Sequence, residues 1–74
     1  MSFIHNGQTY DSSQMEAFHW LDPQIGAVYL TPQRDAVFVA INDDFRGVSV
    51  HQADANEIKF LARRFTLPQL LAAI

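Results

Sequence analysis

The sequence predicts an α+β fold in which a small antiparallel β-sheet packs against helices. Three observations carry this prediction: short β-prone runs separated by turn residues, an Asn6-Gly7 pair between the first two runs, and helical spacing of apolar residues after Asp54. The loops between the central runs are too short for parallel crossovers, so their strands should form an antiparallel meander. At a length of 74 residues, we expect residues 1–74 to form a single compact domain.

The N-terminal segment is expected to form a hairpin and then a short helix. Asn6-Gly7 favours a type I′ turn, because both central residues of that turn take positive φ angles. Ser13 and Glu16 have the spacing of a capping box, and Asp11 with Gln14 offers the same pattern two residues earlier. We therefore expect a helix that runs to about Leu21 and ends before Pro23. The apolar residues that would share the inward face of this helix are Met15, Phe18 and Leu21.

Three strands are expected in the middle of the chain, over residues 27–31, 36–41 and 48–51. The second of these is apolar on both faces, which is typical of a strand covered on both sides. We therefore expect the N-terminal helix and the C-terminal helices to cover opposite faces of it, or a second copy of the chain to cover one face. In the third strand, the period-two alternation predicts that Val48 and Val50 point into the core.

Two helices are expected after the strands. Asp54 and Glu57 form a second capping-box pattern, which predicts a helix that extends through Phe65. Thr66 is placed to cap a final short helix over residues 67–74, with Pro68 in its first turn. The complete prediction is an N-terminal hairpin plus a three-stranded meander, packed with a short N-terminal helix and two C-terminal helices.

No residue pattern in the sequence points to catalysis, a cofactor or a metal. The chain has no Cys, and none of His5, His19 and His51 has a second His or Cys at metal-ligand spacing. Glycines occur singly, so no phosphate-binding loop is recognisable. We therefore expect a non-enzymatic protein with no catalytic, cofactor-binding or metal-ligating residues.

Charge and hydropathy limit the compartment and the partners. The formal net charge is −3, and five Lys and Arg residues are few for the basic face that a phosphate backbone requires, so a nucleic-acid partner is disfavoured. No run approaches the roughly 18 apolar residues of a membrane span, and the first residues lack the basic flank and apolar run of a signal peptide. We therefore expect a cytoplasmic protein that does not contact a membrane.

The apolar content predicts a binding surface. Hydrophobic residues make up 49% of the chain and charged residues only 18%, which is little charge for so small a domain. Phe60 lies about 200° round its helix from Ile58, opposite the core-facing stripe, and Trp20 lies off the apolar face of the first predicted helix. Phe60 could alternatively pack against residues 67–74, and the apolar tail over residues 70–74 is itself either core or interface. The predicted partner-binding residues are Glu16, Trp20, Asp43, Asp44, Asn56, Phe60, Arg63 and Arg64.

These features favour a non-enzymatic protein-binding module. In general character the chain is similar to the small acidic inhibitors that phages and mobile elements direct against host machinery, anti-CRISPR proteins included. The similarity is one of size, charge and composition, so it transfers no site residue. Two alternatives are open: a dimeric DNA-binding regulator that uses the helix pair 54–74, and a nucleic-acid mimic whose acidic side chains replace phosphates. We also favour a homodimer, because the strand over residues 36–41 needs cover on both faces.

Overall fold

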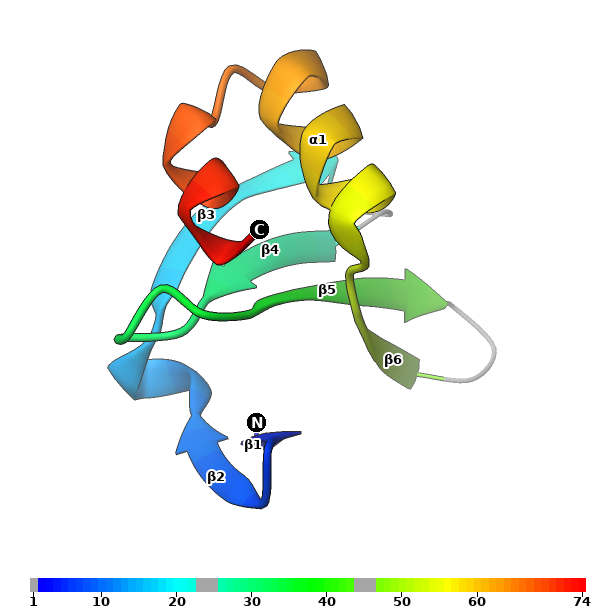
Figure 1. Cartoon of the computed structure of the whole chain (residues 1–74). Coiled ribbons are helices and arrows are strands. Elements are labelled where there is room, and N and C mark those ends of the chain that lie inside the picture. The colour runs from blue at the N-terminus through cyan, green and yellow to red at the C-terminus, as the bar shows by residue number, and fades with distance from the viewer. Residues whose placement is uncertain (1, 23–25, 44–46) are drawn as a thin grey trace.

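The computed structural model describes residues 2–22, 26–43 and 47–74 (Figure 1). The fold is α+β, with two antiparallel sheets and one main helix. In chain order its elements are the strands β1 (Ser2–His5) and β2 (Gln8–Asp11), the 3₁₀ turn η1 (Ser12–Gln14), the strands β3 (Glu16–Asp22), β4 (Gly26–Leu30), β5 (Val37–Asp43) and β6 (Gly47–Gln52), the helix α1 (Ala55–Arg64) and the 3₁₀ helix η2 (Pro68–Ala73).

The larger sheet has four strands in the order β3-β4-β5-β6, so consecutive strands pair as an antiparallel meander. Helices α1 and η2 cover one face of this sheet, and the β1–β2 hairpin packs on the other face (Figure 1). The hairpin forms as predicted: Asn6 and Gly7 have φ angles of 51° and 75°, and Phe3 lies opposite Tyr10. These angles are those that a type I′ turn requires.

Strand β5 contributes side chains to two separate cores. The core on the α1 side consists of Val28, Leu30, Val37, Val39, Ala53, Ile58, Leu61, Ala62, Leu67 and Leu70. The core on the hairpin side consists of Phe3, Tyr10, Met15, Ala36 and Phe38. The prediction that this strand is covered on both faces is confirmed, but a hairpin provides the second cover where a helix was expected. Because the chain itself covers both faces, the strand gives no argument for a second copy.

The predicted helix over residues 13–21 is wrong. The chain makes one 3₁₀ turn and then extends as β3, with Phe18 opposite Val28 and Glu16 opposite Leu30. Ser13 does not cap a helix, because its backbone N–H and its hydroxyl both donate to Asp11 Oδ1, at 2.9 and 2.7 Å. A helix here would leave one edge of β4 unpaired, whereas the extended chain satisfies that edge with backbone hydrogen bonds. Pairing with β4 therefore outweighs the local capping signal.

Strand β6 is present, but Val48 and Val50 are exposed by 47% and 40%, so their predicted burial is wrong. The register explains this result. Val50 lies opposite Ala40, on the face that carries Phe38, whereas His51 lies opposite Val39 on the α1 face. The hairpin-side core reaches Phe38 and includes neither valine of β6. The two valines therefore lie beyond the cover that the hairpin provides.

Helix α1 begins as predicted, because Asp54 Oδ1 accepts a hydrogen bond of 2.8 Å from the Glu57 N–H. The predicted role of Thr66 is wrong: it has a φ angle of 56° and ends α1 instead of capping the next helix. The N–H of Leu67 donates to the Ala62 carbonyl at 2.9 Å, which is the long-range hydrogen bond of a Schellman motif. This left-handed turn sends the chain back across α1.

A short helix follows α1, as predicted for residues 67–74, and it is the 3₁₀ helix η2. With three residues per turn, positions three apart lie on one face. Leu70 is fully buried, whereas Leu71 and Ile74 are exposed by 46% and 57%. One face of this segment therefore completes the core and the other is exposed, and the role of the exposed face as an interface stays a prediction.

Candidate interaction surface on helices α1 and η2

Two adjoining hollows lie on the outer side of α1. The larger, which we call the α1–η2 groove, has a volume of about 330 Å³ and is lined by Lys59, Ala62, Arg63, Pro68 and Leu71. The smaller, which we call the Phe60 hollow, has a volume of about 250 Å³ and is lined by Asn56, Lys59, Phe60 and Arg63. Lys59 and Arg63 line both hollows, so the two cations separate one apolar area from the other.

Helix α1 positions these side chains by its own periodicity. Ile58, Leu61 and Ala62 of α1 face the core. The residues on the opposite side of the helix, which recur every three or four positions, therefore face solvent. Phe60 lies in that outward row and is 62% exposed. Of the two alternatives left open for Phe60, the structure therefore has the exposed one and not packing against η2.

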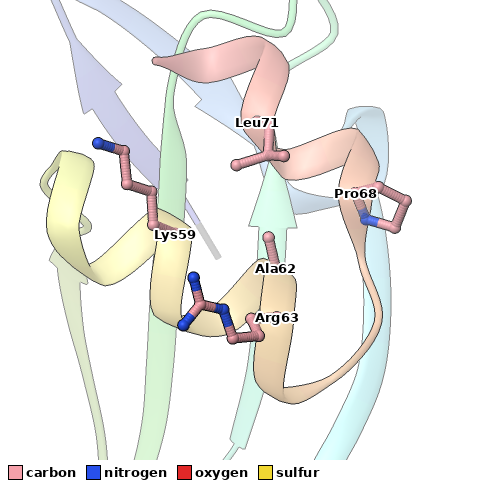
Figure 2. A pocket seen from close by; sticks show the side chains of 5 residues that line it. All are labelled: Lys59, Ala62, Arg63, Pro68 and Leu71. Atoms are coloured by element: carbon pink, nitrogen blue, oxygen red, sulfur yellow. The ribbon is translucent and has the colours of Figure 1, made fainter.

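Helix η2 forms the second wall of the groove. The left-handed turn at Thr66 folds η2 back along α1, and Figure 2 shows the Leu71 side chain directed from η2 towards Ala62 of α1. Ala62 is 8% exposed, and its small side chain leaves space between Lys59 and Leu71. The groove therefore has an apolar floor with Lys59 and Arg63 on its α1 side.

Among the residues that the structure describes, the two cations of the groove have no partner of opposite charge. Within the described ranges, the ion pairs join His5 to Asp35, Arg34 to Glu16 and His51 to Glu57, and none reaches Lys59 or Arg63. Lys59 and Arg63 are four residues apart, so these like charges are neighbours on the helix surface. An anion that bound between them would relieve their repulsion.

The predicted site residues do not all meet. Asn56, Phe60 and Arg63 come together around the Phe60 hollow. Arg64 lines neither hollow, since its guanidinium carbon lies 5.3 Å from the centroid of the Phe65 ring. Glu16 is in β3, where its Oε1 lies 3.4 Å from Arg34 Nη2. Trp20 and Asp43 lie in β3 and β5, but their side chains are outside the described part of the structure, as is Asp44 entirely.

Sequence reasoning missed Lys59, Ala62 and Pro68 as members of this surface, whereas Leu71 belongs to the tail over residues 70–74 that was left open as core or interface. Lys59 had a recognisable signal, because it lies four residues before Arg63 and next to Phe60. Pro68 had none, because its place beside α1 depends on the turn at Thr66.

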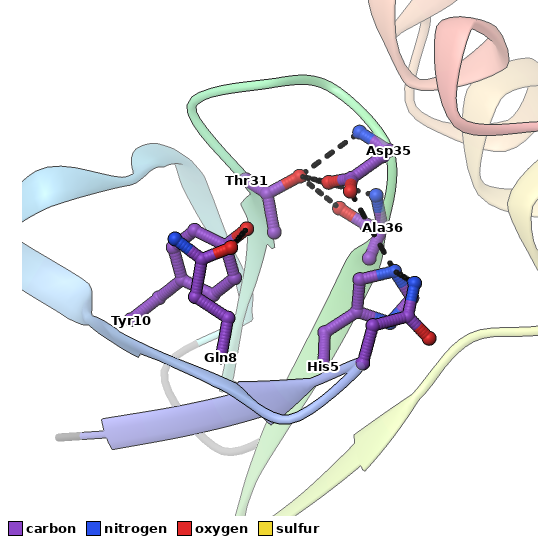
Figure 3. Close-up of polar contacts among 7 residues, drawn as sticks. His5, Gln8, Tyr10, Thr31, Asp35 and Ala36 are labelled. Atoms are coloured by element: carbon purple, nitrogen blue, oxygen red, sulfur yellow. Dashed lines mark hydrogen bonds and ion pairs between the residues drawn. The ribbon is translucent and has the colours of Figure 1, made fainter.

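The polar cluster around Thr31 connects the turn between β4 and β5 to the hairpin (Figure 3). Thr31 Oγ1 donates to Asp35 Oδ1 at 2.6 Å and accepts from the N–H groups of Asp35 and Ala36, at 3.0 and 3.1 Å. Asp35 Oδ2 also lies 3.7 Å from His5 Nε2, which connects the hairpin to the turn between β4 and β5. This cluster is internally satisfied and connects elements of the fold, so it does not form a candidate site.

The described residues contain no group of three His, Cys, Asp or Glu side chains that could hold a metal ion. In the same part of the chain, no helix is long and apolar enough to cross a membrane. Comparison with protein-family models, with curated proteins and with solved structures gave no match.

Proposed function

We propose that the chain is a non-enzymatic protein-binding module whose binding surface is the outer side of α1 together with η2. The observation that carries this proposal is the 62% exposure of Phe60 beside Arg63, next to a groove floored by Leu71. Aromatic residues, Phe included, and Arg are enriched in protein interfaces relative to the rest of a protein surface.

The proposal includes how such a module would act. A protein of this size can block a partner by occupying the surface that the partner needs, without chemistry of its own. This is the mode of the small phage and mobile-element inhibitors to which the chain is similar in size, charge and composition. We therefore propose that the chain inhibits a partner in the cytoplasm by occupying the surface that the partner needs.

The dimeric DNA-binding alternative draws support from Lys59 and Arg63, which pair with no carboxylate in the described part of the chain. The element that follows α1 weakens this alternative, because it is a 3₁₀ helix of six residues. A recognition helix must carry several polar side chains to base edges, and of the six residues of η2 only Gln69 has a polar side chain.

Affinity capture from bacterial lysate tests the proposal. The immobilised full chain is compared with Phe60→Ala and with Ile4→Ala, a matched control because Ile4 is 69% exposed on the hairpin, away from α1. We expect at least one protein retained equally by wild type and Ile4→Ala but about tenfold less by Phe60→Ala. Equal retention by all three chains would show that α1 is not the binding surface.

A further inference from the structure

We infer that the α1–η2 groove binds an acidic protein segment with an apolar anchor: an aliphatic or aromatic side chain against Leu71 and Pro68, flanked by carboxylates that pair with Lys59 and Arg63. This inference rests on the proposed function and adds the chemical class of the partner.

The first argument is charge complementarity. Lys59 and Arg63 are one helical turn apart, both are exposed, and neither is paired with a carboxylate in the described part of the chain. The cations inside this groove thus lack the compensation that Arg34 receives from Glu16. Arg binds a carboxylate through two parallel hydrogen bonds, which makes a carboxylate a well-matched ligand for Arg63.

The second argument is the apolar floor. Leu71 is 46% exposed, although its neighbour Leu70 is fully buried, and Leu71 faces the small side chain of Ala62 (Figure 2). The groove volume of about 330 Å³ is far above the roughly 30 Å³ share of one water molecule, so the groove admits a side chain. An apolar anchor would remove the exposed face of Leu71 from water, which a purely acidic ligand would not do.

The third argument favours carboxylates over phosphates. The chain has a net charge of −3, and only two cations line the groove and the adjoining Phe60 hollow. A nucleic-acid backbone would extend past these two cations and meet the negative field of the rest of the protein. A short segment with two or three carboxylates would contact only the groove, so attraction to the two cations there is sufficient.

Selection from a random peptide display library, with the immobilised full chain as bait, tests the inference. We expect the enriched peptides to share acidic residues on both sides of an aliphatic or aromatic residue. A synthetic peptide of that consensus should bind the Lys59→Gln/Arg63→Gln double variant at least about tenfold more weakly than wild type. Arg34→Gln removes a cation outside the groove and should change the affinity by less than about twofold.

Two matched peptides separate the two halves of the recognition. Replacing the carboxylates by amides, or the apolar anchor by Ser, should each weaken binding. Thermal denaturation of every variant checks that it is folded, and amide chemical shifts of Lys59, Arg63 and Leu71 on titration should localise the peptide.

Other outcomes would overturn the inference. Enriched peptides without acidic residues, but dependent on Phe60 or Leu71, would reject it and leave the proposed function standing. Peptides whose binding is unaffected by substitutions on α1 and η2 would reject both. Tighter binding of duplex DNA than of the acidic peptide at equal salt would make phosphate the ligand. A dimer by light scattering that Lys59→Gln/Arg63→Gln dissociates would make a second copy the occupant.

Discussion

The Nε2 atom of His51 lies 2.9 Å from both carboxylate oxygens of Glu57, so this pair joins edge strand β6 to helix α1. Glu57 is also the residue whose N–H donates to the Asp54 cap, which places the contact in the first turn of the helix. The side chains are 45% and 34% exposed, so solvent screens the interaction.

At a pH at which His51 is protonated, a double-mutant cycle on His51→Ala and Glu57→Gln should give a coupling free energy of about 0.2–1 kcal/mol, the range for exposed ion pairs. The measurement is the free energy of unfolding from urea denaturation of wild type, both single variants and the double variant. Additive effects of the two substitutions would show that the contact does not stabilise the fold.

Thr66→Gly should stabilise the protein by about 1 kcal/mol, because a β-branched residue at a φ angle of 56° is strained and glycine is not. Urea denaturation measures the gain. Thr66→Ala keeps a Cβ atom, so it should recover much less of the gain. Destabilisation by the glycine substitution would mean that the Thr66 side chain makes an interaction that offsets the strain.

Gly26→Ala should lower the free energy of unfolding by more than about 2 kcal/mol. Gly26 has a φ angle of 120°, and a Cβ atom there would overlap the carbonyl oxygen of Ala40 on the paired strand β5. Gly7→Ala is the matched control, since Gly7 has a φ angle of 75° but nothing within 4 Å of an added Cβ. Its cost should be limited to about 1 kcal/mol. Equal losses in denaturation curves would contradict the overlap.

Ionisation of the Asp11 carboxylate makes the stability of the fold depend on pH in the acid range. The Ser13 backbone N–H and then the Ser13 hydroxyl, both donating to its carboxylate, lower the pKa of Asp11 from its usual 3.8. A folded-state pKa below the unfolded value contributes stability that is present above pH 3.8 and lost as the pH falls through the lower, folded-state pKa.

The Tm of wild type should therefore exceed that of Asp11→Asn near neutral pH, and this difference should shrink as the pH falls from about 4 to 2. Thermal melts followed by circular dichroism over that range provide the comparison. A difference that stays constant across the range would show that ionisation of Asp11 does not contribute.

Lys59→Gln should stabilise the free protein by about 0.2–0.5 kcal/mol at low salt, because it removes a like-charge pair four residues apart on α1. Added salt should reduce the gain, since it screens the repulsion in the wild type. The same substitution should weaken binding of an acidic peptide, so stability and binding would change in opposite directions. A loss of stability at low salt would indicate an unrecognised favourable contact of Lys59.

Local hydrogen bonding made some elements predictable from the sequence. The Asn6-Gly7 turn and the Asp54 cap depend on residues within a few positions, and both form as predicted. Strand β3 was missed because Ser13 and Glu16 signal a helix locally, whereas the decisive interaction, pairing with β4, comes from residues 26–30. Val48 and Val50 were misplaced because alternation identifies two faces of a strand without saying how far each is covered.

The candidate surface also has one part that was predictable from the sequence and one part that was not. Helical periodicity was sufficient to place Asn56, Phe60 and Arg63 on one side of α1. The groove beside them was not predictable, because it needs η2 to return along the helix. That return depends on a threonine in a left-handed conformation, which residue preferences disfavour.

Because the side chains of β5 belong to two separate cores, we expect the parts of the molecule on its two faces to differ in stability. Among the described residues, the core on the hairpin side has five buried members, of which the hairpin contributes Phe3 and Tyr10, whereas the core on the α1 side has ten. We therefore expect the hairpin to open as a separate unit while α1 and the four-stranded sheet remain folded. Amide hydrogens of β1 and β2 should then exchange with solvent through this partial opening, and those of β4 and β5 only when the whole protein unfolds.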